Sequence, residues 1–172
     1  MKQSVSDINF NPFCLFWVIA LISAMALGMA FVAQYVFGLA PCNLCVIQRW
    51  PYGIIIALGI IGAFMHVSPN MAKVIMGLIG LTFLTNSAIA FYHSGVERLW
   101  WKSMLEGCNA PKLEGSAAEV LAKIQSIKEA VRCDEIPWAD PIFGLSMANY
   151  NVIFCAGLGI ATIYAAFKYF KA

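Results

Sequence analysis

Four long apolar segments restrict the folds open to this chain more than any other feature of its sequence. A helix needs about 20 predominantly apolar residues to cross a bilayer. Segments of that length cover about residues 13–35, 46–65, 74–92 and 147–167. Lipid offers the backbone no hydrogen-bond partner, so only helices and closed barrels can span it. These segments are continuously apolar, whereas barrel strands alternate, and they therefore predict four membrane-spanning helices in one membrane domain over residues 1–172.

The first apolar segment also invites comparison with a secretory signal peptide. The apolar core of a signal peptide is only about 7–15 residues long and ends at a small-residue cleavage site. Here the apolar segment is longer and leads directly into a cysteine motif at residues 42–45. We therefore expect the first segment to remain in the protein as a membrane span.

Charged residues are scarce, and the acidic ones gather in one stretch. Charged side chains make up 12% of the chain, whereas an ordinary soluble domain has about 25%. Eight of the nine acidic residues lie between Glu97 and Asp140, so this stretch forms the aqueous part of the protein. Its charges are mixed in sign and form no basic patch, which argues against a nucleic-acid partner. The composition instead favours the lipid bilayer as partner.

The number of spans determines which segments share a side of the membrane. With four spans, both termini lie on one side, and the outer loops at about residues 36–45 and 94–146 lie on the other. The segments on the side of the termini carry four lysines and one acidic residue: Lys2, Lys73, Lys168, Lys171 and Asp7. Basic residues are enriched on the cytoplasmic side. The sequence therefore predicts cytoplasmic termini and an antiparallel four-helix bundle.

The long outer loop contains one segment with the pattern of an amphipathic helix, at residues 116–132. Ser116 and Glu119 form a capping-box pattern at its start. Apolar residues then recur at helical spacing on one face: Val120, Leu121, Ile124, Ile127 and Val131. Such a helix can lie on the membrane surface or pack against its own loop, and the sequence leaves both arrangements open.

The six cysteines divide into two groups. Cys14 and Cys155 lie in apolar segments, where a free cysteine behaves as a small hydrophobic residue, so we interpret both as packing residues. The other four lie in the two outer loops: Cys42, Cys45, Cys108 and Cys133. An even number of cysteines on one side of the membrane suggests disulfides in an oxidising compartment.

Cys42 and Cys45 stand where the chain enters the second span. The positive end of a helix dipole stabilises a thiolate there. Arg49 follows Cys45 by four residues and so shares its helix face, and a guanidinium beside a thiolate favours the charged form. We therefore expect Cys45 to be the more stable thiolate, although Arg49 also suits a purely anchoring role at the interface. His93, at the outer end of the third span, either faces a common pocket with Arg49 or is simply an interfacial residue.

Other functions remain open at this point. Cys108 and Cys133 either form a structural disulfide or exchange with the first pair, Cys42 and Cys45, through thiolate attack. A zinc site built from the outer cysteines is disfavoured in an oxidising compartment, so we expect no metal. Covalent haem needs a histidine directly after the second cysteine, where the chain has Val46. The rival to redox chemistry is a four-helix membrane scaffold or transporter with structural disulfides, but the spans hold few buried polar residues.

Taken together, the motifs resemble the DsbB family, the membrane thiol oxidases of bacterial disulfide formation. The resemblance covers nearly the whole chain and depends on four features besides the spans. They are Pro-Cys-Asn-Leu-Cys at residues 41–45, Gln48-Arg49, the Cys108 and Cys133 pair, and Cys-Asp-Glu-Ile-Pro-Trp at 133–138 followed by Phe-Gly-Leu-Ser at 143–146.

The resemblance implies a protein-dithiol:quinone oxidoreductase in the bacterial inner membrane, with its cysteine loops in the periplasm. A Cys108–Cys133 disulfide would accept electrons from a thioredoxin-like partner of the DsbA type, and Cys108 would form the mixed disulfide. Cys133 would then exchange with Cys42. Cys45, as a thiolate beside Arg49, would reduce a membrane quinone, either ubiquinone or menaquinone, with His93 at the quinone site.

Overall fold

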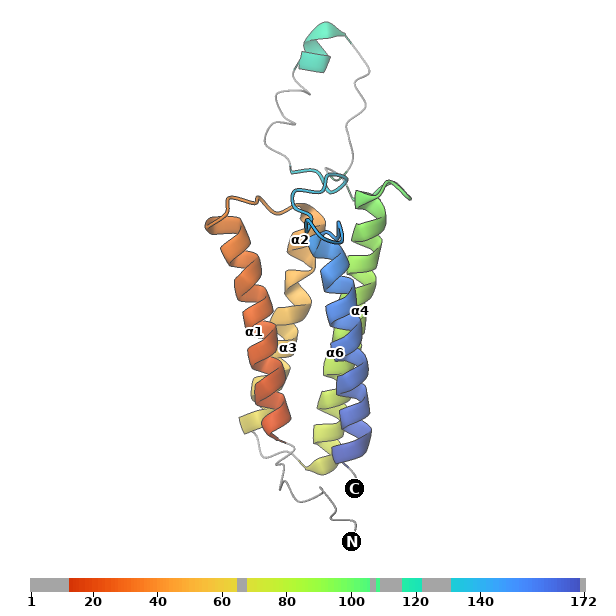
Figure 1. Ribbon diagram of the computed structural model, residues 1–172. Coiled ribbons are helices and arrows are strands. Elements are labelled where there is room, and N and C mark those ends of the chain that lie inside the picture. The colour runs from red at the N-terminus through yellow and green to blue at the C-terminus, as the bar shows by residue number, and fades with distance from the viewer. Residues whose placement is uncertain (1–12, 65–67, 106–107, 109–115, 122–130, 171–172) are drawn as a thin grey trace.

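The computed structural model describes residues 13–64, 68–105, 108, 116–121 and 131–170 (Figure 1). Regular structure within these residues is helical, apart from an isolated bridge between Ala139 and Ser146. The named helices are α1 (Cys14–Tyr35), α2 (Asn43–Ile47), α3 (Arg49–Phe64), α4 (Pro69–Glu97) and α6 (Met147–Tyr169).

Within the described residues, four helical segments are long and apolar enough to cross a membrane, which confirms the predicted all-α membrane fold. They are α1, α4, α6 and the consecutive pair α2 and α3, which together cover Asn43–Phe64. Helix α4 begins earlier than its predicted span because Ser68 caps its first turn, accepting a hydrogen bond from the Met71 N–H at 3.4 Å. At its other end α4 continues to Glu97.

The predicted loop helix is described only at its start. Residues 117–121 are helical, and the capping contact is present: the Ser116 N–H donates to the Glu119 carboxylate at 2.8 Å. Residues 122–130 lie outside the described part of the chain. That the helix continues to residue 132, and that it lies on a membrane surface, therefore stay predictions.

The bundle consists of two helix pairs, α1 with α3 and α4 with α6 (Figure 1). Glycines let the second pair approach closely. A Cβ atom added at Gly159 would lie 3.1 Å from the Gly80 carbonyl oxygen and 2.8 Å from the Leu84 side chain. Small residues at such crossings are how membrane helices gain close packing without a hydrophobic driving force. The α4–α6 crossing therefore depends on Gly80 and Gly159.

We expect Gly159→Val to lower the thermal unfolding midpoint in detergent, because the added side chain must push α6 away from α4. Overpacking of this kind costs about 1–3 kcal/mol. Gly157→Val is the matched control, since an added Cβ at Gly157 meets no atom within 4 Å. Equal midpoints for the two variants, measured by circular dichroism, would contradict the close crossing.

The two helix pairs meet where α3 contacts α4, and again at the end where α1 begins and α6 ends. There the Phe170 ring lies 6.0 Å from the Phe13 ring and 5.7 Å from the Phe16 ring, centroid to centroid. The outward faces of the helices remain apolar: Leu21 and Met25 on α1 are 60% and 64% exposed. Exposed apolar surface of this extent suits contact with lipid rather than water. The opposite end, which carries residues 36–42 and 131–146, is called the loop end below.

Candidate active site

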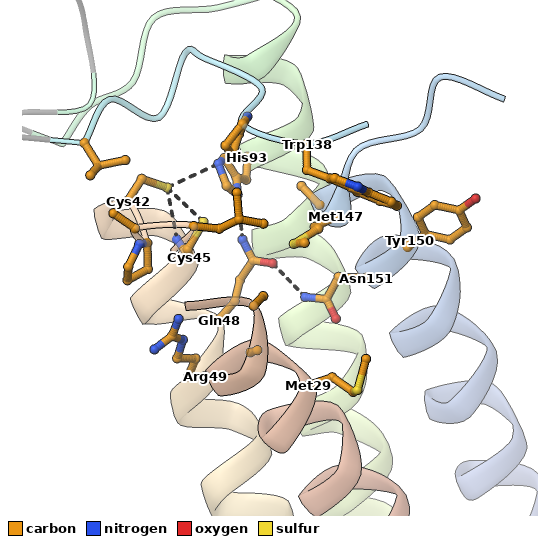
Figure 2. Close-up of a pocket in the computed structure, with 18 of the residues that line it drawn as sticks. Met29, Cys42, Cys45, Gln48, Arg49, His93, Trp138, Met147, Tyr150 and Asn151 are labelled. Carbon is orange, nitrogen blue, oxygen red and sulfur yellow. Dashed lines mark hydrogen bonds between the residues drawn. The ribbon is translucent and has the colours of Figure 1, made fainter. Parts of the chain in front are cut away.

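The Cys42–Cys45 motif is built into the first turn of α2. Cys42 is the N-cap residue, in extended conformation, and its Sγ accepts a hydrogen bond from the Cys45 N–H at 3.3 Å. The two sulfur atoms lie 3.0 Å apart (Figure 2). Helix α2 ends at Ile47 and α3 begins at Arg49. Pro51 accounts for this interruption, because it has no N–H to donate to the Ile47 carbonyl.

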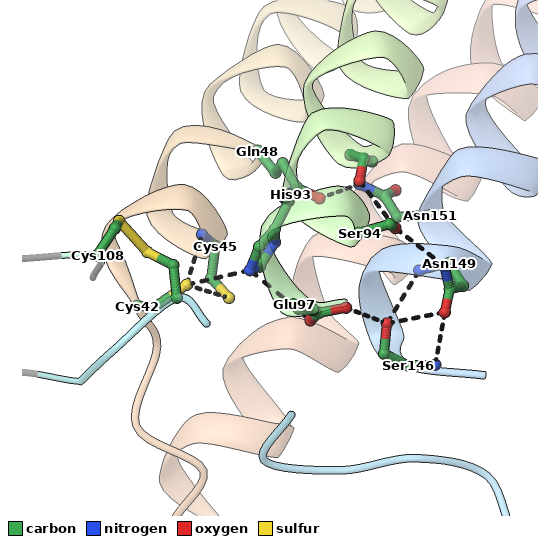
Figure 3. Close-up of polar contacts among 12 residues, drawn as sticks. Cys42, Cys45, Gln48, His93, Ser94, Glu97, Cys108, Ser146, Asn149 and Asn151 are labelled. Atoms are coloured by element: carbon green, nitrogen blue, oxygen red, sulfur yellow. Dashed lines mark hydrogen bonds and ion pairs between the residues drawn. A yellow bond between two sulfur atoms is a disulfide. The ribbon is translucent and has the colours of Figure 1, made fainter. Parts of the chain in front are cut away.

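The structure brings all four outer cysteines together at the loop end. Cys108 and Cys133 are joined in a disulfide, which is the pairing that the family resemblance implies, whereas Cys42 and Cys45 are free thiols. Both disulfide cysteines are fully buried and belong to one cluster with Cys42 (Figure 3). A thiolate at position 42 would therefore have a disulfide in its immediate surroundings, which is the requirement for exchange between the pairs.

His93 joins this cysteine cluster from α4. Its Nε2 atom lies 3.5 Å from the Cys42 Sγ and 3.7 Å from the Glu97 Oε1. On its other side, Nδ1 lies 2.9 Å from the amide nitrogen of Gln48. With that amide nitrogen donating to Nδ1, the ring hydrogen resides on Nε2 and faces the sulfur. The predicted common pocket of His93 and Arg49 exists, but His93 makes its close contact with Cys42.

The more stable thiolate is Cys42 rather than Cys45, which had been expected from the position of Arg49. The pKa of Cys42 is lowered to about 4, chiefly because Cys45 hydrogen bonds to its sulfur. Burial opposes this by raising the pKa, and the hydrogen bond from His93 lowers it further. The sequence argument failed because it weighed Arg49 and overlooked that the N-cap sulfur, not the one inside the helix, receives the helical N–H.

We expect alkylation of Cys42 by iodoacetamide to be nearly independent of pH between about pH 5 and pH 8, because a thiol with a lowered pKa is already thiolate there. A cysteine with an ordinary pKa of about 8.5 reacts faster as the pH rises from about 5 to 8, because its thiolate fraction increases. Mass spectrometry of the Cys42 peptide from the reduced protein gives the rate. His93→Ala should slow the reaction at about pH 5. A wild-type rate that rises about tenfold per pH unit throughout would contradict the assignment.

Arg49 turns toward α1. Its Nη1 donates to the Gln34 side-chain oxygen at 2.6 Å, and its Cζ lies 5.1 Å from the centroid of the Phe31 ring. Figure 2 shows the guanidinium on the side of Gln48 away from His93. Arg49 therefore links α3 to α1 and lines the same cavity as the cysteines. This position is compatible both with a role in the cysteine site and with a purely anchoring role.

A chain of buried polar side chains continues from His93 into the bundle. The Gln48 side-chain oxygen accepts a hydrogen bond from the Asn151 amide at 2.6 Å, and Asn151 in turn accepts one from the Tyr52 hydroxyl. The hydroxyl also lies 3.2 Å from the Cys155 sulfur. Cys155 is fully buried in the apolar core, which agrees with its predicted packing role.

Sequence reasoning did not single out Asn151, Tyr52 or Glu97. The signal for Asn151 was present, since a polar residue within an apolar membrane segment usually faces the bundle interior and a partner. Glu97 was counted only as one charge of the long loop. Its position on the last turn of α4, one turn after His93, becomes visible only once that helix is seen to continue beyond the apolar segment.

A cavity of about 1000 Å³ opens at the loop end. Its walls come from α1, α6 and the loops, and they are apolar over most of their area. Its polar side chains include Cys42, Cys45, Arg49, His93 and Glu97. Apolar walls with a few convergent polar groups are typical of a small-molecule site.

Comparison with known proteins gives a consistent result. A model of the family described as disulfide bond formation protein DsbB matches residues 13–165. Disulfide bond formation protein B 2 of Pseudomonas savastanoi pv. phaseolicola is 29% identical over 167 residues, which cover 91% of this chain and 89% of that relative. Disulfide bond formation protein B of Chromobacterium violaceum is 29% identical over 158 residues, which cover 87% of this chain and 89% of that relative.

A further relative, Uncharacterized protein RP370 of Rickettsia prowazekii, is 31% identical over 143 residues, which cover 79% of this chain and 77% of that relative. No solved structure matches the chain. The family match at residues 13–165 contains both cysteine pairs and the four apolar helical segments, except for the last few residues of α6. A multi-pass membrane protein with paired cysteines at one end of its bundle is what disulfide formation in a membrane requires, and this chain belongs to the DsbB family of disulfide bond formation proteins.

Proposed function

We propose that the protein is a protein-dithiol:quinone oxidoreductase. It reoxidises a periplasmic, thioredoxin-like dithiol protein of the DsbA type and passes the electrons through its two cysteine pairs to a membrane quinone. The observation that carries this proposal is the position of the Cys42–Cys45 dithiol. It belongs to one buried cluster with the Cys108–Cys133 disulfide, and it also lines a large apolar cavity.

The protein-facing pair is Cys108 and Cys133. A reduced partner attacks this disulfide at Cys108, and Cys133 then exchanges with the first pair at Cys42. The structure has the loop pair oxidised and the first pair reduced. That is the state expected after the first pair has given its disulfide to the loop and before its electrons leave. Burial of both loop sulfurs fits a state in which that pair is not yet open to the next partner.

The quinone-facing pair is Cys42 and Cys45. Cys45 is half-buried and lines the cavity together with Arg49 and His93. A bound quinone supplies the capacity to accept two electrons, and its carbonyl oxygens are acceptors for guanidinium and imidazole N–H donors. Arg49 would hold the ring by charge-assisted hydrogen bonding, His93 would offer its Nε2 hydrogen, and the apolar walls would exclude water from the sulfurs.

The proposed location is the bacterial inner membrane, with the termini cytoplasmic and the cysteine loops periplasmic. Two independent features support this orientation. The lysines on the side of the termini follow the positive-inside rule. The loop disulfide at the opposite end is of a kind that persists in oxidising compartments such as the periplasm.

The experiment that tests the proposal reconstitutes the whole reaction. Purified protein is mixed with a reduced DsbA-type protein and ubiquinone, or menaquinone in a parallel reaction, and quinone absorbance is followed. We expect catalytic loss of quinone together with oxidation of the partner. If neither quinone is consumed, the oxidoreductase function is wrong and a scaffold with structural disulfides becomes the better interpretation.

A further inference from the structure

Glu97 is a buried carboxyl group in the cavity wall. Electron transfer between the two cysteine pairs does not explain why a carboxyl group lies there. The residue is 8% exposed and lines the cavity from the last turn of α4. Its Oε2 atom accepts a hydrogen bond from the Ser146 hydroxyl at 2.5 Å, and its Oε1 lies 3.7 Å from the His93 Nε2 (Figure 3). Burying a carboxylate without a cationic partner is costly. Either a cation must therefore pair with Glu97 or Glu97 must hold a proton.

No arginine in the described part of the chain forms an ion pair with Glu97. Arg49 donates to Gln34 on α1, and Arg98 donates to Asn149 on α6. Arg132 pairs with Asp134 and Glu135 in the loop. The other titratable groups that line the cavity are the Cys42 and Cys45 sulfurs and the Tyr52 and Tyr150 hydroxyls. Glu97 is therefore paired with the His93 imidazole, whose Nε2 lies 3.7 Å from its Oε1, and not with an arginine.

His93 lies between the carboxyl group of Glu97 and the sulfur of Cys42. Its Nδ1 is held by Gln48, so Nε2 is the ring atom that faces both Cys42 and Glu97. Gln48 is fixed in turn by Asn151 from α6. The ring is thus held in one orientation with its hydrogen on Nε2, so His93 acts as a hydrogen-bond donor and leaves Glu97 as the group that can hold a transferable proton.

The number of protons that quinone reduction consumes suggests a role for Glu97. This step of the inference rests on the proposed function. Closing the Cys42–Cys45 disulfide from a Cys42 thiolate and a Cys45 thiol releases two electrons and one proton. Reducing a quinone to a quinol consumes two electrons and two protons. One more proton has to come from the protein, and a Cys42 thiolate next to a charged Glu97 would place two negative groups in one buried site.

We propose that Glu97 holds a proton while the Cys42–Cys45 pair is reduced and supplies it, from its own position in the cavity wall, as the second proton of quinone reduction. When the disulfide closes, the negative charge leaves Cys42 and appears on Glu97, so the net charge of the site is unchanged. The next dithiol that reduces the pair brings the proton that recharges Glu97. Glu97 also clamps α4 to α6 through Ser146, and the test must separate that structural role from proton supply.

Glu97→Gln separates the two roles, because the amide keeps the size of the side chain and an oxygen for the Ser146 hydroxyl but holds no transferable proton. The first readout uses the full chain in detergent without quinone. Infrared difference spectra are recorded between the reduced protein and protein oxidised by ferricyanide, which takes electrons but no protons. We expect a protonated-carboxyl carbonyl band in the reduced state that disappears on oxidation. It should be absent from Glu97→Gln and retained in Glu119→Gln, whose carboxylate is exposed in the loop.

The second readout is the single-turnover rate of quinone reduction. We expect Glu97→Gln to slow it by about 10²-fold, the range of proton-transfer catalysis, without weakening quinone binding. Ser146→Ala, which removes the clamp but keeps the carboxyl group, should retain the infrared band. A wild-type spectrum without the band, or Glu97→Gln at the wild-type rate while the wild type reduces quinone, overturns this inference alone. A wild type that reduces no quinone overturns it together with the proposed function.

Discussion

Cys42→Ser or Cys45→Ser abolishes quinone reduction whatever the electron donor, whereas Cys108→Ser or Cys133→Ser abolishes it only when the donor is the protein partner. The reason is the order of the two pairs in space. The first pair lines the cavity, and the loop pair lies behind it. A small dithiol such as dithiothreitol is able to reduce the first pair directly, so it bypasses the loop.

The measurement compares quinone consumption driven by a reduced DsbA-type protein with consumption driven by dithiothreitol. Because redox residues act as a unit, losing one sulfur should reduce the affected rate by about 10³-fold or more. Cys14→Ser is the matched control, since Cys14 is an exposed free cysteine at the opposite end of the bundle. If loop variants lose dithiothreitol-driven activity as completely as first-pair variants, the proposed order of electron transfer is wrong.

Arg49→Gln should raise the apparent quinone KM by about 10- to 100-fold, because a hydrogen bond to a charged group contributes about 1.5–3 kcal/mol. The KM for the protein partner should not change. Arg49 also tethers α3 to α1 through Gln34 and Phe31. A second variant therefore has to separate loss of this tether from loss of a quinone contact.

Gln34→Ala separates them, because it removes the tether and leaves the guanidinium in the cavity. We expect its quinone KM to stay within about threefold of the wild type, a difference of less than about 1 kcal/mol. The quinone KM of Arg49→Lys should lie between those of Arg49→Gln and Gln34→Ala, since lysine keeps the charge but not the planar donor geometry. Equal KM changes in Arg49→Gln and Gln34→Ala would assign Arg49 an anchoring role only.

The helices and the number of spans were predictable because lipid imposes a simple rule on length and apolarity. The same rule misplaced the start of α4, since Ser68 and Pro69 set that boundary by capping and not by hydropathy. The Cys42 and Cys45 pair was also visible from spacing alone. Its thiolate was assigned to the wrong sulfur because the N-cap geometry and the His93 contact belong to the folded turn and to another helix.

Contacts between helices account for the rest of what the sequence did not reveal. Gln48, Tyr52 and Asn151 form one hydrogen-bonded chain from two membrane segments, and no spacing within one segment predicts which polar residues will meet. Glu97 joins the cavity only because α4 continues past the apolar segment. The roles assigned to Arg49 and His93 by resemblance are compatible with their positions and stay proposals until quinone binding is measured.

The central claim is that the Cys42–Cys45 dithiol delivers its electrons to a quinone. The most direct measurement is a single anaerobic turnover without any protein partner. Protein carrying the loop disulfide and the reduced first pair is mixed with excess ubiquinone or menaquinone, quenched in acid, and its free thiols are located by mass spectrometry. We predict one quinol formed per protein, with loss of the thiols at positions 42 and 45 and no change at 108 and 133. Quinone that stays oxidised, or quinol formed while Cys42 and Cys45 remain thiols, would contradict the account.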